Sequence, residues 1–312
     1  VNKELALKES IARLNPINDD VSVAVQNQYE ENPYPRWIDT QLEIRPLSIN
    51  QVIAQQELQV IRDISLLSEA PQILIAGCGT GQHALDTASS FEKSHITAID
   101  LSLSSLAYAK RKTEELGFTN IDYLQADILD LGMLGKQFDI IESVGVLHHM
   151  ADPLSGWKIL TDCLKPGGMM KIGLYSELAR QHVVTARDLI AEKNISADKK
   201  GMLTFREEMT KLDDPGLNLL KTSIDFYSTS TVRDLLFHVQ EHRFTIPQIS
   251  AALDELGLAF MGFTFPEKSI MKAFKMAYPK KDALYDLDTW HDYETSNPRL
   301  FFGMYAFWAQ KL

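Results

Sequence analysis

The stretch Ile73-Leu-Ile-Ala-Gly-Cys-Gly-Thr-Gly81 decides the fold, because it joins an apolar run to a glycine-rich turn. The run at its start is typical of a buried parallel strand. Its three glycines let the backbone turn tightly and approach a ligand without interference from Cβ atoms. We expect a helix over Gln82 to Ser90, whose first N–H groups face the turn. The stretch therefore indicates a site for a nucleotide-type cofactor.

A second strand is predicted at His95 to Asp100, after the helix expected over Gln82 to Ser90. The acid at its end suits the hydroxyl groups of a ribose. A dinucleotide turn follows the pattern Gly-x-Gly-x-x-Gly. Here the third glycine comes one position earlier, and Gln82 stands where a dinucleotide turn needs its glycine. The pattern argues against a dinucleotide.

The tighter pattern resembles that of the class I S-adenosylmethionine (SAM) methyltransferases, and the resemblance continues over the first 175 residues. The turn Leu164-Lys-Pro-Gly-Gly168 is a hallmark of that family. The other elements that we expect in the family's order are a strand at Ile121 to Leu124, a strand at Phe138 to Glu142, the loop Ser143 to Pro153, a helix at Leu154 to Leu164 and a strand at Met169 to Leu174. The resemblance implies SAM as the cofactor.

The resemblance also implies which residues hold SAM. Asp100 is expected at the ribose, Asp127 at the adenine amino group, and the loop after Glu142 at the methionine end. An N-terminal segment is expected to close over the site. The expected cofactor contacts are Gly77, Cys78, Gly79, Gly81, Gln82, Asp100, Leu101, Asp127, Ile128, Glu142, Ser143, Tyr29, Tyr34 and Arg36.

One position departs from the family pattern. Family members usually carry an acid two residues before the first glycine, where it reaches the amino group of the methionine, and here that residue is Ile75. The replacement is expected among the backbone carbonyls near Gly77, the side chain of Gln82, the loop of Glu142 and Ser143, or an N-terminal residue.

Composition narrows the range of partners. Lys and Arg total 31 against 42 for Asp and Glu, so the net charge is −11 and nucleic acid is not expected as a partner. Two cysteines, Cys78 and Cys163, make up neither a disulfide framework nor a zinc quartet. Without a signal-peptide pattern or an apolar run of about eighteen residues, we expect a cytoplasmic protein with no membrane partner. The first residue is Val, which is consistent with a processed or trimmed chain.

The expected fold is α/β, with a doubly wound seven-stranded sheet that is mostly parallel and has an antiparallel last strand. An N-terminal helical segment and helical cap insertions are added to it. The expected division is an N-terminal helical or latch segment at 1–70, a SAM-binding core at 71–176, a helical cap insertion at 177–244 and completion of the core at 245–312, with a second insertion at about 266–300. Insertions of this length are usually lids or substrate pockets, so we expect both to roof the acceptor site.

Further local predictions concern the parts outside the core. Before it, we expect a helix at about 49–67, and an ordered non-helical loop from Tyr29 to Trp37 because Pro33 and Pro35 exclude a regular helix. This loop is either a hydrophobic latch or a cover over SAM. After the core, we expect a helix at Ile246 to Leu256 and strands at Leu258 to Phe265 and Phe301 to Gln310.

Three histidines are candidates for the chemistry. Methyl transfer needs a base only if the nucleophile must lose a proton. His149, which follows the fourth strand beside His148, is expected at the acceptor site. His238 and His242 are predicted four residues apart on one face of a helix with Glu241 and Arg243. That face is either an acceptor-recognition or base site, or a solvated helix face.

The letters His-x-x-Glu-His at 238–242 also match an inverted zinc peptidase. A zinc site needs a third ligand and another surrounding fold, so we expect no metal. The leading interpretation is a methyltransferase that acts on an oxygen, nitrogen or sulfur atom of a small or medium-sized metabolite. The alternatives are a protein or peptide methyltransferase and a noncatalytic SAM-binding partner. A polypeptide partner or a homodimer stays open.

Overall fold

The computed structural model describes residues 2–35, 37–40, 42–43, 45–223 and 226–312. Among these residues, no helix is long and apolar enough to cross a bilayer. The elements in chain order are α1 (Asn2–Ser10), β1 (Ala12–Arg13), α2 (Asp20–Glu31), α3 (Ile49–Gln55), β2 (Gln72–Ala76), α4 (Gln82–Ser90), β3 (His95–Asp100), α5 (Leu103–Glu115), β4 (Ile121–Gln125), β5 (Phe138–Val144), α6 (Pro153–Asp162), β6 (Leu164–Leu174), α7 (Gln181–Glu192), α8 (Lys199–Lys211), α9 (Pro215–Lys221), α10 (Thr229–Phe237), α11 (Ile246–Leu256), β7 (Leu258–Phe263), α12 (Lys268–Ala277), α13 (Leu287–Ser296) and β8 (Tyr305–Lys311).

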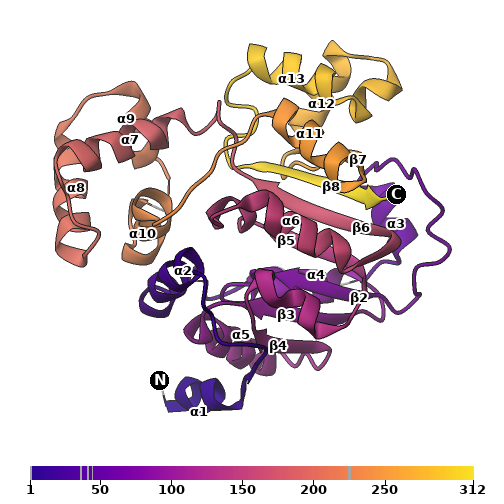
Figure 1. Ribbon diagram of the computed structural model, residues 1–312. Helices are drawn as coiled ribbons and strands as arrows, with labels where there is room; N and C mark the ends of the chain where they lie inside the picture. The colour runs from indigo at the N-terminus through magenta and orange to yellow at the C-terminus, as the bar shows by residue number, and fades with distance from the viewer. Residues whose placement is uncertain (1, 36, 41, 44, 224–225) are drawn as a thin grey trace.

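The strands form one sheet in the order β1-β4-β3-β2-β5-β6-β8-β7. Strands β1 to β6 pair in parallel, and β8 lies antiparallel between β6 and β7 (Figure 1). This confirms the predicted α/β fold with its antiparallel last strand. The sheet has an eighth strand, β1, which the sequence did not indicate because two residues carry no periodic signal.

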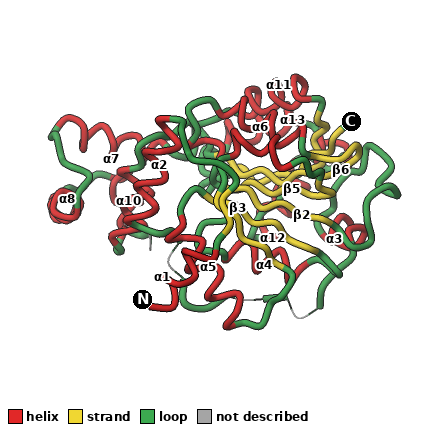
Figure 2. The backbone as a smooth tube through the Cα atoms, turned by 60° about the horizontal axis from the view of Figure 1, so that its bottom comes forward, coloured by secondary structure: helices red, strands yellow, loops and turns green. Residues whose placement is uncertain are grey.

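Side chains along each strand point alternately to the two faces of the sheet, and each face has its own buried core. Leu74 and Ala76 of β2 belong to a buried cluster that includes residues of α6 and α11. Ile73 and Ile75 point the other way, into a cluster with residues of α3, α4 and α5. Successive side chains of a strand face opposite sides, so a strand that is apolar at every position requires helices on both. Figure 2 shows the sheet with helices around it.

The predicted bounds hold for α4, β3 and α11, whereas several others are corrected. The predicted helix at 49–67 ends at Gln55, because Glu57 adopts a left-handed φ of 55° and turns the chain. The turn predicted at 165–168 lies within β6, which pairs with β5 from Leu164 onward. The strand predicted at 258–265 ends earlier, at Phe263, and the strand predicted at 301–310 begins later, at Tyr305. Residues 264–304 between them belong to the second insertion and its return to the sheet.

The first insertion forms a helical cap, the segment α7 to α10. It has its own buried cluster, which includes Phe205, Met209 and Val232. An isolated bridge between Ser176 and Phe244 closes its base, so the chain leaves the sheet and returns at one place. In Figure 1 the cap lies to the left of the sheet, next to α2.

The second insertion lies elsewhere. Helix α13 packs on α11, and its Trp290 stacks on Phe274 of α12 with ring centroids 3.5 Å apart. Both rings are fully buried in the cluster that covers one face of the sheet. The expectation that both insertions roof the acceptor site is therefore wrong for this one, because its aromatic residues extend the core instead.

Candidate active site

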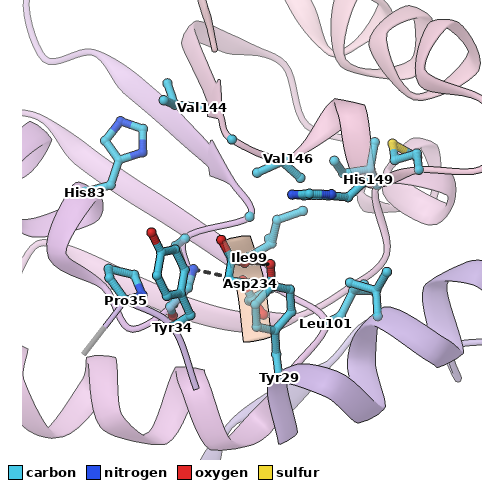
Figure 3. Close-up of a pocket in the computed structure, with 18 of the residues that line it drawn as sticks. Tyr29, Tyr34, Pro35, His83, Ile99, Leu101, Val144, Val146, His149 and Asp234 are labelled. Atoms are coloured by element: carbon cyan, nitrogen blue, oxygen red, sulfur yellow. Dashed lines mark hydrogen bonds between the residues drawn. The ribbon is translucent and has the colours of Figure 1, made fainter. Parts of the chain in front are cut away.

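A cavity of about 360 Å³ opens at the carboxyl ends of the central strands. Its walls come from the glycine turn after β2, the ends of β3 and β5, helix α2 and the cap residue Asp234 (Figure 3). Ligands of open α/β sheets bind outside the carboxyl ends of the strands. The cavity therefore lies where the sequence places the cofactor.

The glycine turn forms one wall, and it requires its glycines. Gly77 has a φ of 80°, and a Cβ there would lie 2.3 Å from Val146 Cγ2. Gly79 has a φ of 52°, and a Cβ there would lie 2.6 Å from the carbonyl oxygen of Tyr34. The turn is thus a cradle in which backbone, not side chains, meets a ligand.

Two acids at the ends of β3 and β4 line the cavity. Asp100 accepts hydrogen bonds from the backbone N–H groups of Gly79, at 2.8 Å, and Ser102, at 2.9 Å. Loss of water around this carboxylate raises the pKa of Asp100 to about 6. Asp127 accepts from the N–H of Leu129 at 3.0 Å, and burial raises its pKa. Each carboxylate retains acceptor capacity for hydroxyl or amino groups of a nucleoside.

The N-terminal segment packs on the glycine turn and also lines the cavity. The backbone N–H of Thr80 donates to the carbonyl oxygen of Tyr34 at 3.3 Å. The Thr80 hydroxyl donates to the carbonyl oxygen of Pro35 at 2.5 Å. The indole N–H of Trp37 donates to the Thr80 carbonyl at 3.1 Å. The non-helical loop predicted from Tyr29 begins later, because Tyr29 belongs to α2. Arg36, an expected cofactor contact, lies outside the described residues.

Most of the other expected cofactor contacts lie together. Those that line the cavity are Tyr29, Tyr34, Gly77, Cys78, Gly79, Gln82, Asp100, Leu101, Asp127 and Ile128. Gly81, Glu142 and Ser143 are not among the described lining residues. A Cβ on Gly81 would lie 2.5 Å from Ala109 Cβ, so this glycine packs on α5, whereas Glu142 and Ser143 are buried within β5. Sequence reasoning missed Tyr175, Asp234 and Met304, because distant segments bring them to the cavity.

The match to known proteins agrees with this geometry. Residues 73–168, which hold the glycine turn, both acids and the loop after β5, match the family described as a methyltransferase domain. Residues 73–168 therefore carry the methyltransferase domain of the class I SAM-dependent family. SAM is the cofactor of this family, and the cradle and acids fit its adenosine.

Individual relatives extend the comparison. An uncharacterized protein from Synechococcus is 30% identical over 234 residues, which are 72% of this chain and 56% of that protein. A ubiquinone biosynthesis O-methyltransferase from Cereibacter sphaeroides is 28% identical over 130 residues, which are 41% of this chain and 51% of that protein. PKMT2 from Rickettsia typhi, solved in complex with AdoHcy, shares the fold with a TM-score of 0.63 at 17% identity, over 89% of this chain and 55% of that one. The chain spans about half the length of these relatives.

A polar cluster lies at the end of the cavity near the cap. The hydroxyl of Tyr29 donates to a carboxyl oxygen of Asp234 at 2.6 Å and lies 3.1 Å from Nε2 of His238. The ring of His238 stacks on that of His149 with centroids 3.5 Å apart. His149 and Asp234 line the cavity, while His238 lies behind them. Figure 3 shows Tyr29, Asp234 and His149 converging.

The predicted helix over residues 237–244 is wrong. Helix α10 ends at Phe237, and the chain from His238 to Arg243 is irregular. His238 and His242 therefore do not share a helix face. The ring of His242 instead contacts the side chain of Gln240 at 2.9 Å and is not among the described residues of the cavity.

Hydrogen bonds to the backbone of Gln240 fix both stacked rings. The carbonyl of Gln240 accepts from Nδ1–H of His149 at 2.6 Å, so the lone pair of the neutral ring is on Nε2. The N–H of Gln240 donates to Nδ1 of His238 at 3.2 Å, so the hydrogen of that ring is on Nε2, facing the Tyr29 hydroxyl. Burial lowers the pKa of His149 to about 4 and that of His238 to about 2. Both rings are neutral at pH 7.

Glu241 serves structure and not acceptor recognition. Its carboxylate receives two hydrogen bonds from the guanidinium of Arg180, at 2.8 and 3.2 Å. The side chains are 1% and 5% exposed, so this is a buried ion pair. The Arg180 guanidinium also lies 3.5 Å from the ring centroid of Tyr175, which stacks on His148. The pair anchors the segment that carries Gln240.

Potential ligand atoms of His149, Asp234 and His238 lie within 4.8 Å of one another. Imidazole binds a metal through lone pairs in the plane of the ring. The two ring planes differ by only 16°, so their lone pairs do not converge on one point. The backbone bonds described above also place the hydrogen of His238 on Nε2. The donor set suits a chain of hydrogen bonds better than a metal.

Proposed function

We propose that this methyltransferase transfers a methyl group from SAM to a hydroxyl oxygen of a small molecule, with His149 as the general base. The observation that carries the proposal is the neutral ring of His149, which lines the cavity with its lone pair on Nε2. A hydroxyl nucleophile must lose a proton, and a neutral imidazole can accept it. The O-methyltransferases among the relatives support oxygen as the acceptor atom.

When bound, SAM supplies a methyl group on a positively charged sulfonium. The chain's part is to align the acceptor, exclude water and accept the proton. The carbonyl of Gln240 holds the His149 ring in one tautomer and stabilises the positive charge that the ring gains with the proton. The low pKa of His149 makes it a weak base that is fully available at neutral pH.

The contact between α2 and α10 supports a small acceptor. Tyr29 and Asp234 join these helices across the end of the cavity at 2.6 Å. A polypeptide acceptor would have to break or bypass this contact, whereas a small molecule can be enclosed behind it. Asp234, one of the two residues in this contact, belongs to the cap. Selection of the acceptor would then depend on a part of the chain outside the matched residues 73–168.

Transfer of tritiated methyl groups from SAM tests the proposal. The purified protein is mixed with pools of small phenolic and aliphatic hydroxyl compounds, small amines, or polypeptides. We expect label in a hydroxyl compound, and a turnover about 10²-fold to 10⁴-fold lower in His149→Gln with unchanged affinity for S-adenosylhomocysteine. His182→Gln, which changes a half-buried cap histidine stacked on Phe302, is the matched control. Label in polypeptides, or binding without transfer to any pool, would refute the proposal.

A further inference from the structure

A buried acid and a histidine meet on the β5 side of the cavity. Oε2 of Glu142 lies 2.5 Å from Nε2 of His83 and accepts from the hydroxyl of Thr87 at 3.0 Å. Glu142 is 2% exposed, whereas His83 lines the cavity. The methyl transfer proposed above uses neither residue.

The charge on Glu142 is fixed by its neighbours in the sheet. In register it lies between Ile75 of β2 and Lys171 of β6, and all three side chains face α4. Burial alone would raise the pKa of Glu142, but Lys171 and the hydrogen bond from His83 lower it to about 2. A full negative charge thus stands behind His83, next to the apolar Ile75.

The order of the strands indicates which part of SAM reaches this charge. Asp127 follows β4 and Asp100 ends β3, so adenosine occupies that side of the cavity, and β2 separates it from β5. The amino-acid part of SAM must therefore extend toward β5. There the chain residues Val144, Gly145 and Val146 offer no side-chain acceptor, whereas His83 and Asp86 of α4 line the cavity.

We propose that Nδ1 of His83 accepts a hydrogen bond from the α-ammonium group of SAM, with Glu142 as the residue that positions His83. When Nε2–H donates to the Glu142 carboxylate, Nδ1 is the ring atom left to accept a hydrogen bond. An ammonium group carries only donors, so it requires an acceptor such as this nitrogen, and the Glu142 carboxylate on the other side of the ring strengthens that acceptor. The acid that β2 lacks at Ile75 is thereby supplied from the adjacent position of the neighbouring strand.

Titration calorimetry with three ligands tests this assignment without turnover. The ligands are S-adenosylhomocysteine, its analogue without the α-amino group and its analogue without the carboxylate. We expect the wild-type protein to bind the deaminated analogue about 10-fold to 100-fold more weakly than S-adenosylhomocysteine, and to lose less with the decarboxylated one. In His83→Phe, S-adenosylhomocysteine should bind as weakly as the deaminated analogue, and the difference between the two should vanish. Glu142→Gln should reduce that difference in part.

The matched control is His95→Phe, which removes another histidine–acid pair, His95 with Asp122 at 2.9 Å, from the exposed surface. It should leave all three affinities unchanged. Equal binding of S-adenosylhomocysteine and the deaminated analogue by the wild-type protein would overturn the assignment, even if His83→Phe failed to fold. So would a loss of discrimination in Asp86→Asn with discrimination kept in His83→Phe. Because no acceptor is present, these outcomes do not depend on the proposed hydroxyl methylation.

Discussion

Replacement of Gly79 by Ala is expected to push the N-terminal segment off the glycine turn and so weaken SAM binding. The new Cβ would lie 2.6 Å from the carbonyl oxygen of Tyr34, which is backbone and cannot rotate away. The segment must move, and the bond from Thr80 N–H to that oxygen, now 3.3 Å, is lost. Tyr34 also lines the cavity, so its displacement removes part of the cofactor's cover.

The magnitude follows from two contributions. A side chain at the left-handed φ of 52° costs about 1–2 kcal/mol. Loss of one backbone hydrogen bond adds about 0.5–1.5 kcal/mol. We expect the free energy of unfolding, measured in urea, to fall by about 2–3 kcal/mol. Affinity for S-adenosylhomocysteine, measured by calorimetry, should fall by about 10-fold, since about 1.4 kcal/mol corresponds to that factor.

Gly135→Ala is the matched control. Gly135 has a similar φ of 62°, but a Cβ there meets nothing within 4 Å. This variant should show only the cost of backbone conformation and keep its affinity. If Gly79→Ala loses no more stability than Gly135→Ala and binds S-adenosylhomocysteine normally, the segment does not cover the cofactor.

Three further predictions concern charged and titrating groups. The pKa of Asp100 is about 6 and the ribose requires the carboxylate, so affinity for S-adenosylhomocysteine should weaken as pH falls through 6. Asp100→Asn should bind this ligand about 10-fold to 100-fold more weakly at pH 7, and its affinity should not show that pH dependence. Equal affinity of the variant and the wild-type protein would contradict the ribose contact. Burial holds the pKa values of His149 and His238 below their unfolded value of about 6.5. These residues therefore contribute stability that is present above pH 6.5 and is lost as pH falls toward 4. In urea titrations over that range, His149→Gln should lose less unfolding free energy than the wild-type protein. Arg180→Met removes two hydrogen bonds from the buried carboxylate of Glu241 and leaves Arg243 and Arg187 near it, at 3.7 and 4.0 Å. The loss should cost about 1.5–3 kcal/mol of unfolding free energy. Lys158→Met in the exposed pair with Asp162 should cost less than about 1 kcal/mol, and similar losses in both variants would contradict the buried ion pair.

The pH dependence also separates sequence-based and structure-based expectations for the base. An unperturbed histidine would predict a fall in turnover near pH 6.5. The buried rings of His149 and His238 instead predict a turnover that stays level from pH 8 to 6. A fall centred near pH 6.5 would indicate a more exposed base than His149.

The sequence by itself determined the parallel strands β2 to β6 and the half of the cavity that the glycine turn and the two acids line. Glycines at 77 and 79 and the acids at 100 and 127 follow consecutive strands of βα units. Parallel strands bring their carboxyl ends to one edge, so residues at those ends converge whatever surrounds them. Local pattern and one topological rule were sufficient for this half.

Only the tertiary structure decided the half of the cavity next to the cap, where we propose the acceptor, and the position of Glu142 behind His83. Tyr29, His149 and Asp234 come from three separate segments, and no short-range pattern links them. The apolar run before His238 suggested a continued helix, but the buried pair of Arg180 and Glu241 and the bridge at Phe244 hold the following residues in an irregular path. Local propensity is worth tenths of a kcal/mol per residue, and a buried ion pair and packing outweigh it. The register that sets Glu142 opposite Ile75 likewise exists only once the strands have paired.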